Sequence, residues 1–386
     1  MNTIKRYVVF DILTIFFVTI AITLLLMTLG GGAKEGIRQG LPPSVVLGTM
    51  PYILPEMLRF TIPGCLLFAV CSVFGRMTVS NEIVAIKSLG INPLSIVWPV
   101  LVVAYLLSIA TFGIYDVCAL WSRPNLRRLV EESVDQIALG YLKANGSFTK
   151  HGISIVVKGV DGDRLLQPLI NIDGRADAPP ITLTAEEARL RANEDAGTLR
   201  FECRNGQIEA TGKACLRFPG HFAHDVVLRE PELHPENRLS PAALGSRVIP
   251  KQITRETAIV SDLRRKLSAQ RGANQEAKTA DLQRQFDSHQ ARLYRLQTEI
   301  PRRFSNGFGC LCFALIGIPV AMKGRSSDTM SVFFCCFMPI LLVYYPLLVV
   351  GENIAREGFY PGLSVWLADA VLLVIGAAMM LRTMRR

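Results

Sequence analysis

Long apolar segments near both ends of the chain set the strongest constraint on its fold. A bilayer core about 30 Å thick is crossed by roughly 20 apolar residues of helix, and six segments of the sequence meet or approach that length. These segments are 8–29, 51–74, 93–115, 308–322, 330–350 and 363–381. The sequence therefore predicts an α-helical membrane protein in which a long polar interval separates two groups of three transmembrane helices.

Composition excludes several other classes of protein. Half of the 386 residues are hydrophobic and only 19% are charged, whereas about a quarter of the residues in a typical soluble domain are charged. A disordered chain, a collagen-like chain and a small disulfide-rich scaffold do not have such apolar blocks. The first apolar segment is followed by Gly30-Gly31-Gly32-Ala33, which fits a signal-peptide cleavage site, but its length favours an uncleaved anchor.

Basic residues in the short loops predict the orientation. They lie in alternate loops, at Lys5, Arg6, Arg76, Lys87, Lys323, Arg325, Arg382, Arg385 and Arg386. The positive-inside rule places these loops in the cytoplasm, so we expect both termini inside and the polar interval outside. Because membrane topology accounts for the net charge of +10, that charge does not indicate nucleic-acid binding.

The polar interval contains two patterns in succession. Residues 145–250 predict an all-β sandwich or open roll, with Asn205-Gly206 suited to a type I′ hairpin. Residues 252–300 predict an amphipathic helix pair that leads into the fourth span and packs either on the sheet or on a coiled-coil partner. The predicted strands are 153–157, 165–172, 181–185, 198–203, 207–210 and 214–218. The expected domains are 1–118, 119–303 and 304–386.

No group of residues indicates catalysis or metal binding. The sequence lacks the Walker P-loop, H-E-x-x-H, G-x-S-x-G and C-x-x-C motifs. His221 and His224 are three residues apart but have no further ligand in metal-binding spacing. We therefore expect no enzyme activity, no metal and no cofactor. The sequence does not decide whether Cys203 and Cys215 form a disulfide, because it does not provide their Cα separation.

Ionisable residues inside membrane spans are functional candidates by default. Glu56 and Arg59 are one helical turn apart in the second span, so mutual pairing is the simplest prediction. Asp11 and Asp369 lie in the first and sixth spans, where either can line a polar cavity. These carboxylates do not form the chain of groups that a proton-driven transporter needs.

The cytoplasmic loop 76–91 predicts a short amphipathic helix. Ser80 or Asn81 suits its N-cap, Glu82 complements the positive end of the helix dipole, and Gly90 suits its C-terminal end. The helix places Ile83, Ile86 and Lys87 on neighbouring faces. Such a helix either docks in the groove of a partner protein or lies on the lipid surface.

This loop resembles the cytoplasmic coupling segment of the LptF/LptG family of lipopolysaccharide-export permeases. The run Arg76 to Gly90 reads R-M-x-x-x-x-E-I-V-A-I-K-S-L-G. A second similar block consists of Arg302-Arg303-Phe304, the segment 312–319 and Gly351-Glu352-Asn353. The order of parts is also similar, with three spans, a periplasmic β-jellyroll and three more spans. The charged stretch 255–299 is longer than the family pattern requires.

The resemblance implies a non-ATPase permease subunit in a bacterial inner membrane. Its implied partners are a second LptF/LptG-type chain, a cytoplasmic LptB-like ATPase dimer that binds the ATP, a periplasmic LptC/LptA-like jellyroll bridge, and lipopolysaccharide. In the family the coupling helix enters a groove of the ATPase, and its acidic residue, here Glu82, pairs with an arginine. The implied coupling residues are Arg76, Glu82, Ile83, Ile86, Lys87 and Gly90.

Two further groups of residues are candidates for lipid contact. Lys34 and Arg38 lie one helical turn apart beyond the outer end of the first span, where they either meet lipid phosphates or act as interfacial anchors. Inward-facing residues of the predicted roll either hold acyl chains or form an ordinary core; they are Ile155, Val157, Leu183 and Phe201. Without lipid binding, the alternative function is a mechanotransmission protein that couples a cytoplasmic ATPase to periplasmic work.

Overall fold

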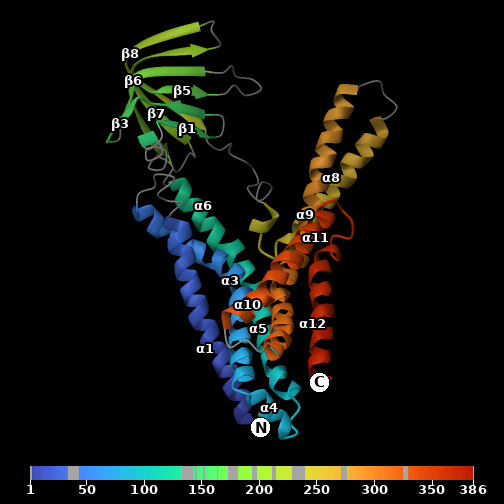
Figure 1. The fold of residues 1–386 in the computed structure, drawn as a ribbon. Helices are drawn as coiled ribbons and strands as arrows, with labels where there is room; N and C mark the ends of the chain where they lie inside the picture. Colours follow the sequence, from blue (N-terminus) through green and yellow to red (C-terminus); the bar gives the residue numbers. More distant parts are fainter. Residues whose placement is uncertain are drawn as a thin grey trace. The chain divides into compact units, whose positions relative to one another are not determined.

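The computed structural model describes most of the chain (Figure 1). The described residues are 2–33, 43–132, 142–143, 146–150, 153–162, 164–172, 181–193, 198–210, 214–227, 240–270, 276–324 and 329–385. Internal contacts divide the chain into two compact units. The first unit consists of Met1–Leu25, Leu54–Ser122 and Arg238–Arg386, and the second consists of Leu26–Ile53 and Arg123–Asn237.

Six helices within the described ranges are long and apolar enough to cross a membrane, which confirms the predicted number. They are α1 (Asn2–Met27), α3 (Pro43–Val79), α5 (Leu94–Val117), α9 (Glu276–Lys323), α10 (Thr329–Pro339) continued by α11 (Tyr345–Arg356), and α12 (Leu367–Arg385). A π-helical turn, Ile340–Tyr344, separates α10 from α11. The short helix α4 (Glu82–Ser88) lies at the same end of the bundle as the two termini (Figure 1).

Helix α9 is the centre of the first unit, where it contacts α5, α10, α11 and α12. A Cβ atom on Gly307 would lie 2.7 Å from the carbonyl oxygen of Ser108 on α5, and one on Gly317 would lie 2.8 Å from Leu67 Cδ1 on α3. Small residues permit such close crossings in membrane bundles, where van der Waals packing drives helix association. The ring of Phe304 also stacks on that of Phe112, with centroids 4.0 Å apart.

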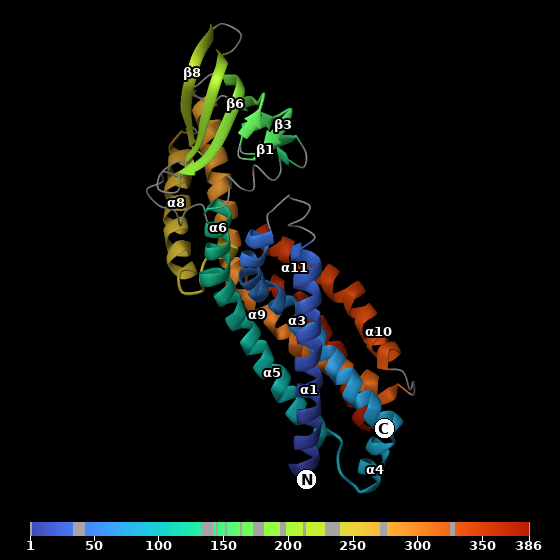
Figure 2. The same cartoon turned by 90° about the vertical axis from the view of Figure 1, so that its left-hand side faces the viewer.

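The predicted helix pair forms α8 (Ile249–Gln270) and the first half of α9, which lie side by side in Figures 1 and 2. Helix α9 then continues without a break into the fourth span. The apolar stripes of the pair meet each other, with Leu263 and Leu293 buried. Between the helices, the carboxylate of the fully buried Glu256 lies 2.9 Å from both His289 Nδ1 and Arg292 Nε.

The second unit contains α6 (Arg123–Glu132) and a β-sheet. Its described strands are β1 (Ser147–Lys150), β2 (Ile153–Val156), β3 (Gly159–Asp161), β4 (Arg164–Leu166), β5 (Leu169–Ile172), β6 (Ile181–Asn193), β7 (Thr198–Ala210) and β8 (Ala214–Val227). They form one antiparallel sheet, in which β6 pairs with both β4 and β5 along one edge and with β7 along the other. An inserted antiparallel β region is thus confirmed.

The predicted hairpin turn at Asn205-Gly206 is wrong, because both residues lie within β7 at a β-bulge. Asn205 has the positive φ of 48° that such an irregularity needs, and its side chain accepts a hydrogen bond from the Gly220 amide at 3.0 Å. A Cβ atom on Gly206 would lie 2.4 Å from the Thr184 carbonyl oxygen. Gln167, also with positive φ, divides the predicted strand 165–172 into β4 and β5.

Cys203 is a free, buried cysteine. The register of β7 and β8 places Cys203 opposite Phe222 and Cys215 opposite Glu209. Six residues of strand separate these two positions, which corresponds to roughly 20 Å, whereas a disulfide needs Cα atoms within about 7 Å. Cys203 and Cys215 are therefore too far apart in this sheet to form a disulfide.

We expect the Cys203 thiol to resist alkylation in the folded protein. Burial raises the pKa of Cys203 to about 11, and the thiolate is the reactive form. At pH 8 the thiolate fraction is about a hundredfold lower than for a thiol with its ordinary pKa of 9.0. Mass spectrometry of the Cys203 peptide after N-ethylmaleimide treatment, with and without denaturant, measures this protection. Rapid labelling without denaturant would contradict it.

Candidate functional site

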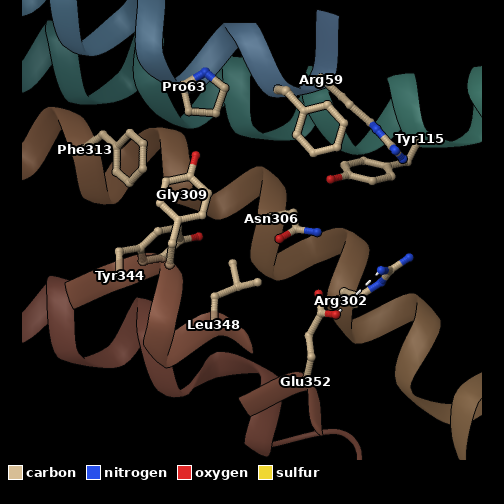
Figure 3. Close-up of a pocket in the computed structure, with 12 residues that line it drawn as sticks. Arg59, Pro63, Tyr115, Arg302, Asn306, Gly309, Phe313, Tyr344, Leu348 and Glu352 are labelled. Carbon is tan, nitrogen blue, oxygen red and sulfur yellow. Dashed lines mark ion pairs between the residues drawn. The ribbon is translucent and has the colours of Figure 1, made fainter. Parts of the chain in front are cut away.

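A pocket of about 250 Å³ lies among α3, α5, α9 and α11 in the first unit (Figure 3). Four positions of α9 form one wall and lie three or four residues apart, on one face of the helix: Arg302, Asn306, Gly309 and Phe313. The wall changes from a cation to an aromatic ring over roughly 16 Å of helix. The pocket is therefore polar at one end and apolar at the other, as Figure 3 shows.

Arg59 supplies one cation at the polar end. Its side chain is 10% exposed and pairs with Glu56, as predicted. The guanidinium carbon also lies 4.6 Å from the ring centroid of Phe60 and 4.9 Å from that of Tyr115. Cation–π contacts of this kind hold an arginine in a defined orientation, so the side chain is positioned before any ligand arrives.

Arg302 supplies the second cation. It contacts Glu299 at 2.9 Å and Glu352 of α11 at 3.8 Å, and Glu352 also contacts Arg356 at 3.0 Å. The Arg302–Glu352 pair joins two separate parts of the second sequence block that carries the family resemblance. Within the described part of the chain, the Nε atoms of Arg59 and Arg302 are buried without a hydrogen-bond partner.

The two arginine side chains that line this end make the pocket suited to an anionic group. Arginine binds phosphate and carboxylate oxygens through charge-assisted hydrogen bonds. At the other end of the pocket, the rings of Phe313 and Tyr344 pack edge to face with centroids 5.3 Å apart, and Leu348 lies beside them. The lining thus suits a molecule with an anionic head and an apolar part.

The next residue of α9, Arg303, has a different role, because its side chain is only 1% exposed. It donates hydrogen bonds to the Leu244 carbonyl oxygen at 2.7 Å, to Asp116 Oδ1 at 3.0 Å and to Glu299 Oε1 at 3.2 Å. These bonds join α5, α9 and the segment before α8. Arg303 therefore stabilises the structure around the pocket, while Arg302 faces the pocket itself.

The predicted helix in loop 76–91 is present as α4. It lies at the end of the bundle that carries the two termini, away from the pocket. Gly90 has a φ of 75°, and its amide donates to the Lys87 carbonyl oxygen at 3.0 Å while the Ile91 amide donates to that of Ile86 at 3.2 Å. These two bonds form a Schellman motif. Asn81 occupies the N-cap position in a left-handed conformation, without a side-chain capping bond.

The two faces of α4 differ in exposure. Ile83 and Ile86 are buried in the core of the bundle. Glu82 is half-buried and Lys87 is exposed. Two apolar side chains that sequence reasoning missed, Val84 and Leu89, are 61% and 73% exposed. Their spacing of five residues is not that of one helical stripe, so the sequence offered no clear signal for them.

Arg76 lies at the end of α3 and forms an ion pair with Asp11 of α1. Its guanidinium also donates to the Tyr7 hydroxyl at 3.3 Å. Neither Asp11 nor Asp369 lines the pocket. Instead, Asp11 connects α1 to the end of α3 that precedes α4, and Asp369 is buried among hydroxyl groups of neighbouring helices.

The predicted lipid contacts have different positions. Lys34 and Arg38 lie outside the described residues. Ile155, Val157 and Leu183 are buried in the core of the sheet, together with Leu165 and others. Phe201 belongs to β7, opposite Leu190 and His224, but its side chain lies outside the described part. The signal for this pocket in the sequence is a polar or charged residue near one end of each of four spans: Arg59, Tyr115, Arg302 and Glu352.

Comparison with known proteins assigns the family. The model of the family described as "Lipopolysaccharide export system permease LptF/LptG" matches residues 6–382, nearly the whole chain. No curated protein matches the chain. The order of six membrane helices with an antiparallel β-sheet inserted after the third agrees with this match. The chain therefore belongs to the LptF/LptG family of lipopolysaccharide export system permeases.

Proposed function

We propose that this permease subunit extracts lipopolysaccharide, or a related phosphorylated glycolipid, from the inner membrane and receives the necessary work from a separate ATPase. The observation that carries this proposal is the pocket among α3, α5, α9 and α11, with two arginine side chains at one end and apolar side chains at the other. The family match makes the protein a multi-pass inner-membrane permease subunit.

The polarity of the pocket matches that of a lipid in the outer leaflet. With both termini and α4 in the cytoplasm, the arginine end of the pocket lies toward the periplasmic surface and the apolar end toward the bilayer centre. A volume of about 250 Å³ is below the range of roughly 300–1,000 Å³ for drug-sized ligands. The pocket therefore holds one phosphorylated part of the glycolipid, while the remainder lies between this chain and a second permease chain.

Helix α4 is the proposed contact with the cytoplasmic ATPase dimer, which binds the ATP. Ile83 and Ile86 anchor the helix to the bundle, so Glu82, Lys87 and the exposed Val84 and Leu89 are left to face a partner. Coupling from α4 to the pocket is mechanical, since Arg59 and Arg76 lie about 25 Å apart along α3. The Arg76–Asp11 ion pair transmits the same movement to α1.

The β-sheet region is the proposed periplasmic module that passes the lipid to a bridge protein of similar jellyrolls. The apolar core that contains Ile155, Val157 and Leu183 is the proposed contact for the acyl chains. Lys34 and Arg38 are proposed to meet the lipid phosphates near the outer membrane surface.

A photo-crosslinking amino acid in place of Leu348 tests the function. We expect it to capture lipopolysaccharide in intact cells, because Leu348 lines the apolar part of the pocket. The matched control is Leu106, which is 58% exposed on α5 outside the pocket and should capture phospholipid instead. Adducts to protein alone at Leu348 would contradict lipid extraction and favour a mechanotransmission role.

A further inference from the structure

A buried carboxyl group joins three membrane helices beside the pocket. Asp369, in the first turn of α12, is 1% exposed. Its Oδ2 atom accepts a hydrogen bond from Ser305 of α9, and its Oδ1 atom accepts one of 3.3 Å from the Tyr344 hydroxyl. A carboxyl group in a membrane span is costly unless it is paired, so its presence indicates a role that an apolar residue cannot fill.

Tyr344 connects this carboxyl group to the pocket. Its hydroxyl bonds to Asp369, while its ring lines the pocket and packs against Phe313. Gly309 makes room for the ring, because a Cβ atom there would lie 3.0 Å from the Tyr344 hydroxyl oxygen. Figure 3 shows Tyr344 beside Gly309 and Leu348.

Tyr344 is also the last residue of the π-helical turn in the fifth span. Such turns frequently mark functional sites within a helix, because the wider turn shifts the register of the side chains that follow. The hydroxyl bond to Asp369 ties this turn to α12, while Ser305 ties α12 to α9. The three residues therefore connect the π-helical turn of the fifth span to α12 and α9.

We propose that Asp369 is a positioning residue for lipid binding, which acts through Tyr344 by holding the π-helical turn of the fifth span against the pocket. The inference rests on the proposed function, because the pocket is taken to bind lipid. Asp369 itself does not touch the lipid. An asparagine at this position replaces one acceptor oxygen by a donating NH2 group, so one of the two hydroxyl groups has to accept instead of donate, and the bond that holds the tyrosine ring is altered.

Lipid titration of the reconstituted permease–ATPase complex tests the proposal, with Asp369→Asn, Tyr344→Phe and the double variant. We expect each single variant to raise the lipopolysaccharide concentration for half-maximal ATPase stimulation by about five- to tenfold, with a smaller effect on the maximal rate. If Asp369 acts through Tyr344, the double variant resembles either single variant. The control is Tyr105→Phe, an exposed tyrosine of α5 outside the pocket, which should match the wild type.

The proposal would be overturned if the half-maximal lipopolysaccharide concentration rose in the double variant by the product of the two single-variant increases. It would also be overturned if that concentration stayed unchanged in the single variants. A measurement without lipid separates its failure from that of the proposed function. Asp369→Asn should increase at least threefold the rate at which maleimide modifies a cysteine placed at Leu348, measured by mass spectrometry of that peptide. An unchanged rate would refute the positioning role even where lipid stimulates the complex, and an increased rate would support it even where lipopolysaccharide gives no stimulation.

Discussion

The Glu82→Lys variant is expected to fold and insert normally but to lose both binding of the ATPase and ATP-driven lipid transport. Glu82 is half-buried in the first turn of α4, where its charge faces the proposed partner. Loss of one partner from a buried charge pair costs about 2–5 kcal/mol, so the affinity for the ATPase should fall at least about 30-fold. Co-purification and the ATPase rate of the reconstituted complex measure this effect.

Glu357→Lys is the matched control, because Glu357 is an exposed carboxylate that follows α11 at the opposite end of the bundle. It makes the same change of charge at the end that is proposed to face the periplasm, and we expect it to retain ATPase binding. Glu82→Gln separates the loss of charge from its reversal and should have a smaller effect. Wild-type transport by the Glu82→Lys variant would remove the assignment of α4 as the coupling helix.

The Arg303→Met variant is expected to be strongly destabilised. Its buried guanidinium bonds to Asp116, Glu299 and the Leu244 carbonyl oxygen, and removing it leaves Asp116 and the Leu244 carbonyl oxygen without this donor and Glu299 with Arg302 alone. Breaking a buried ion pair on one side costs about 3–5 kcal/mol, which corresponds to a decrease of roughly 10 °C in the unfolding temperature. Thermal unfolding of the detergent-solubilised protein measures the change.

The neighbouring Arg302→Met variant should lose less thermal stability than Arg303→Met but more of the response to lipopolysaccharide. The Arg302 side chain is 21% exposed and faces the pocket, so its removal costs less stability but should abolish stimulation of the complex by lipopolysaccharide. Equal destabilisation of the two variants, with equal loss of lipid response, would contradict the division of roles between these adjacent arginines.

The membrane helices and α4 could be predicted from the sequence because their signals are local. An apolar run long enough for the bilayer identifies a span, and Gly90 identifies the end of α4. The sequence did not reveal which face of α4 is free, since Ile83 and Ile86 turn toward a core built from distant helices. The Asn205-Gly206 signal was misassigned because a β-bulge and a type I′ turn both require positive φ.

The pocket could be predicted only in part. The Glu56–Arg59 pair is local to one helix and was predicted correctly. Tyr115, Arg302, Tyr344 and Glu352 come from three other parts of the chain, and only the packing of α5, α9 and α11 brings them together. The burial of Asp369 likewise depends on Ser305 and Tyr344, which are 64 and 25 residues away in sequence.

The most direct test of coupling between α4 and the pocket is photo-crosslinking at Leu348 in proteoliposomes that contain the ATPase, before and after addition of ATP. We predict a lipopolysaccharide adduct without ATP, which decreases during ATP turnover in the wild type and persists in the Glu82→Lys variant. An adduct that ATP leaves unchanged in the wild type, or no lipid adduct under either condition, would contradict the proposal that work received at α4 empties this pocket.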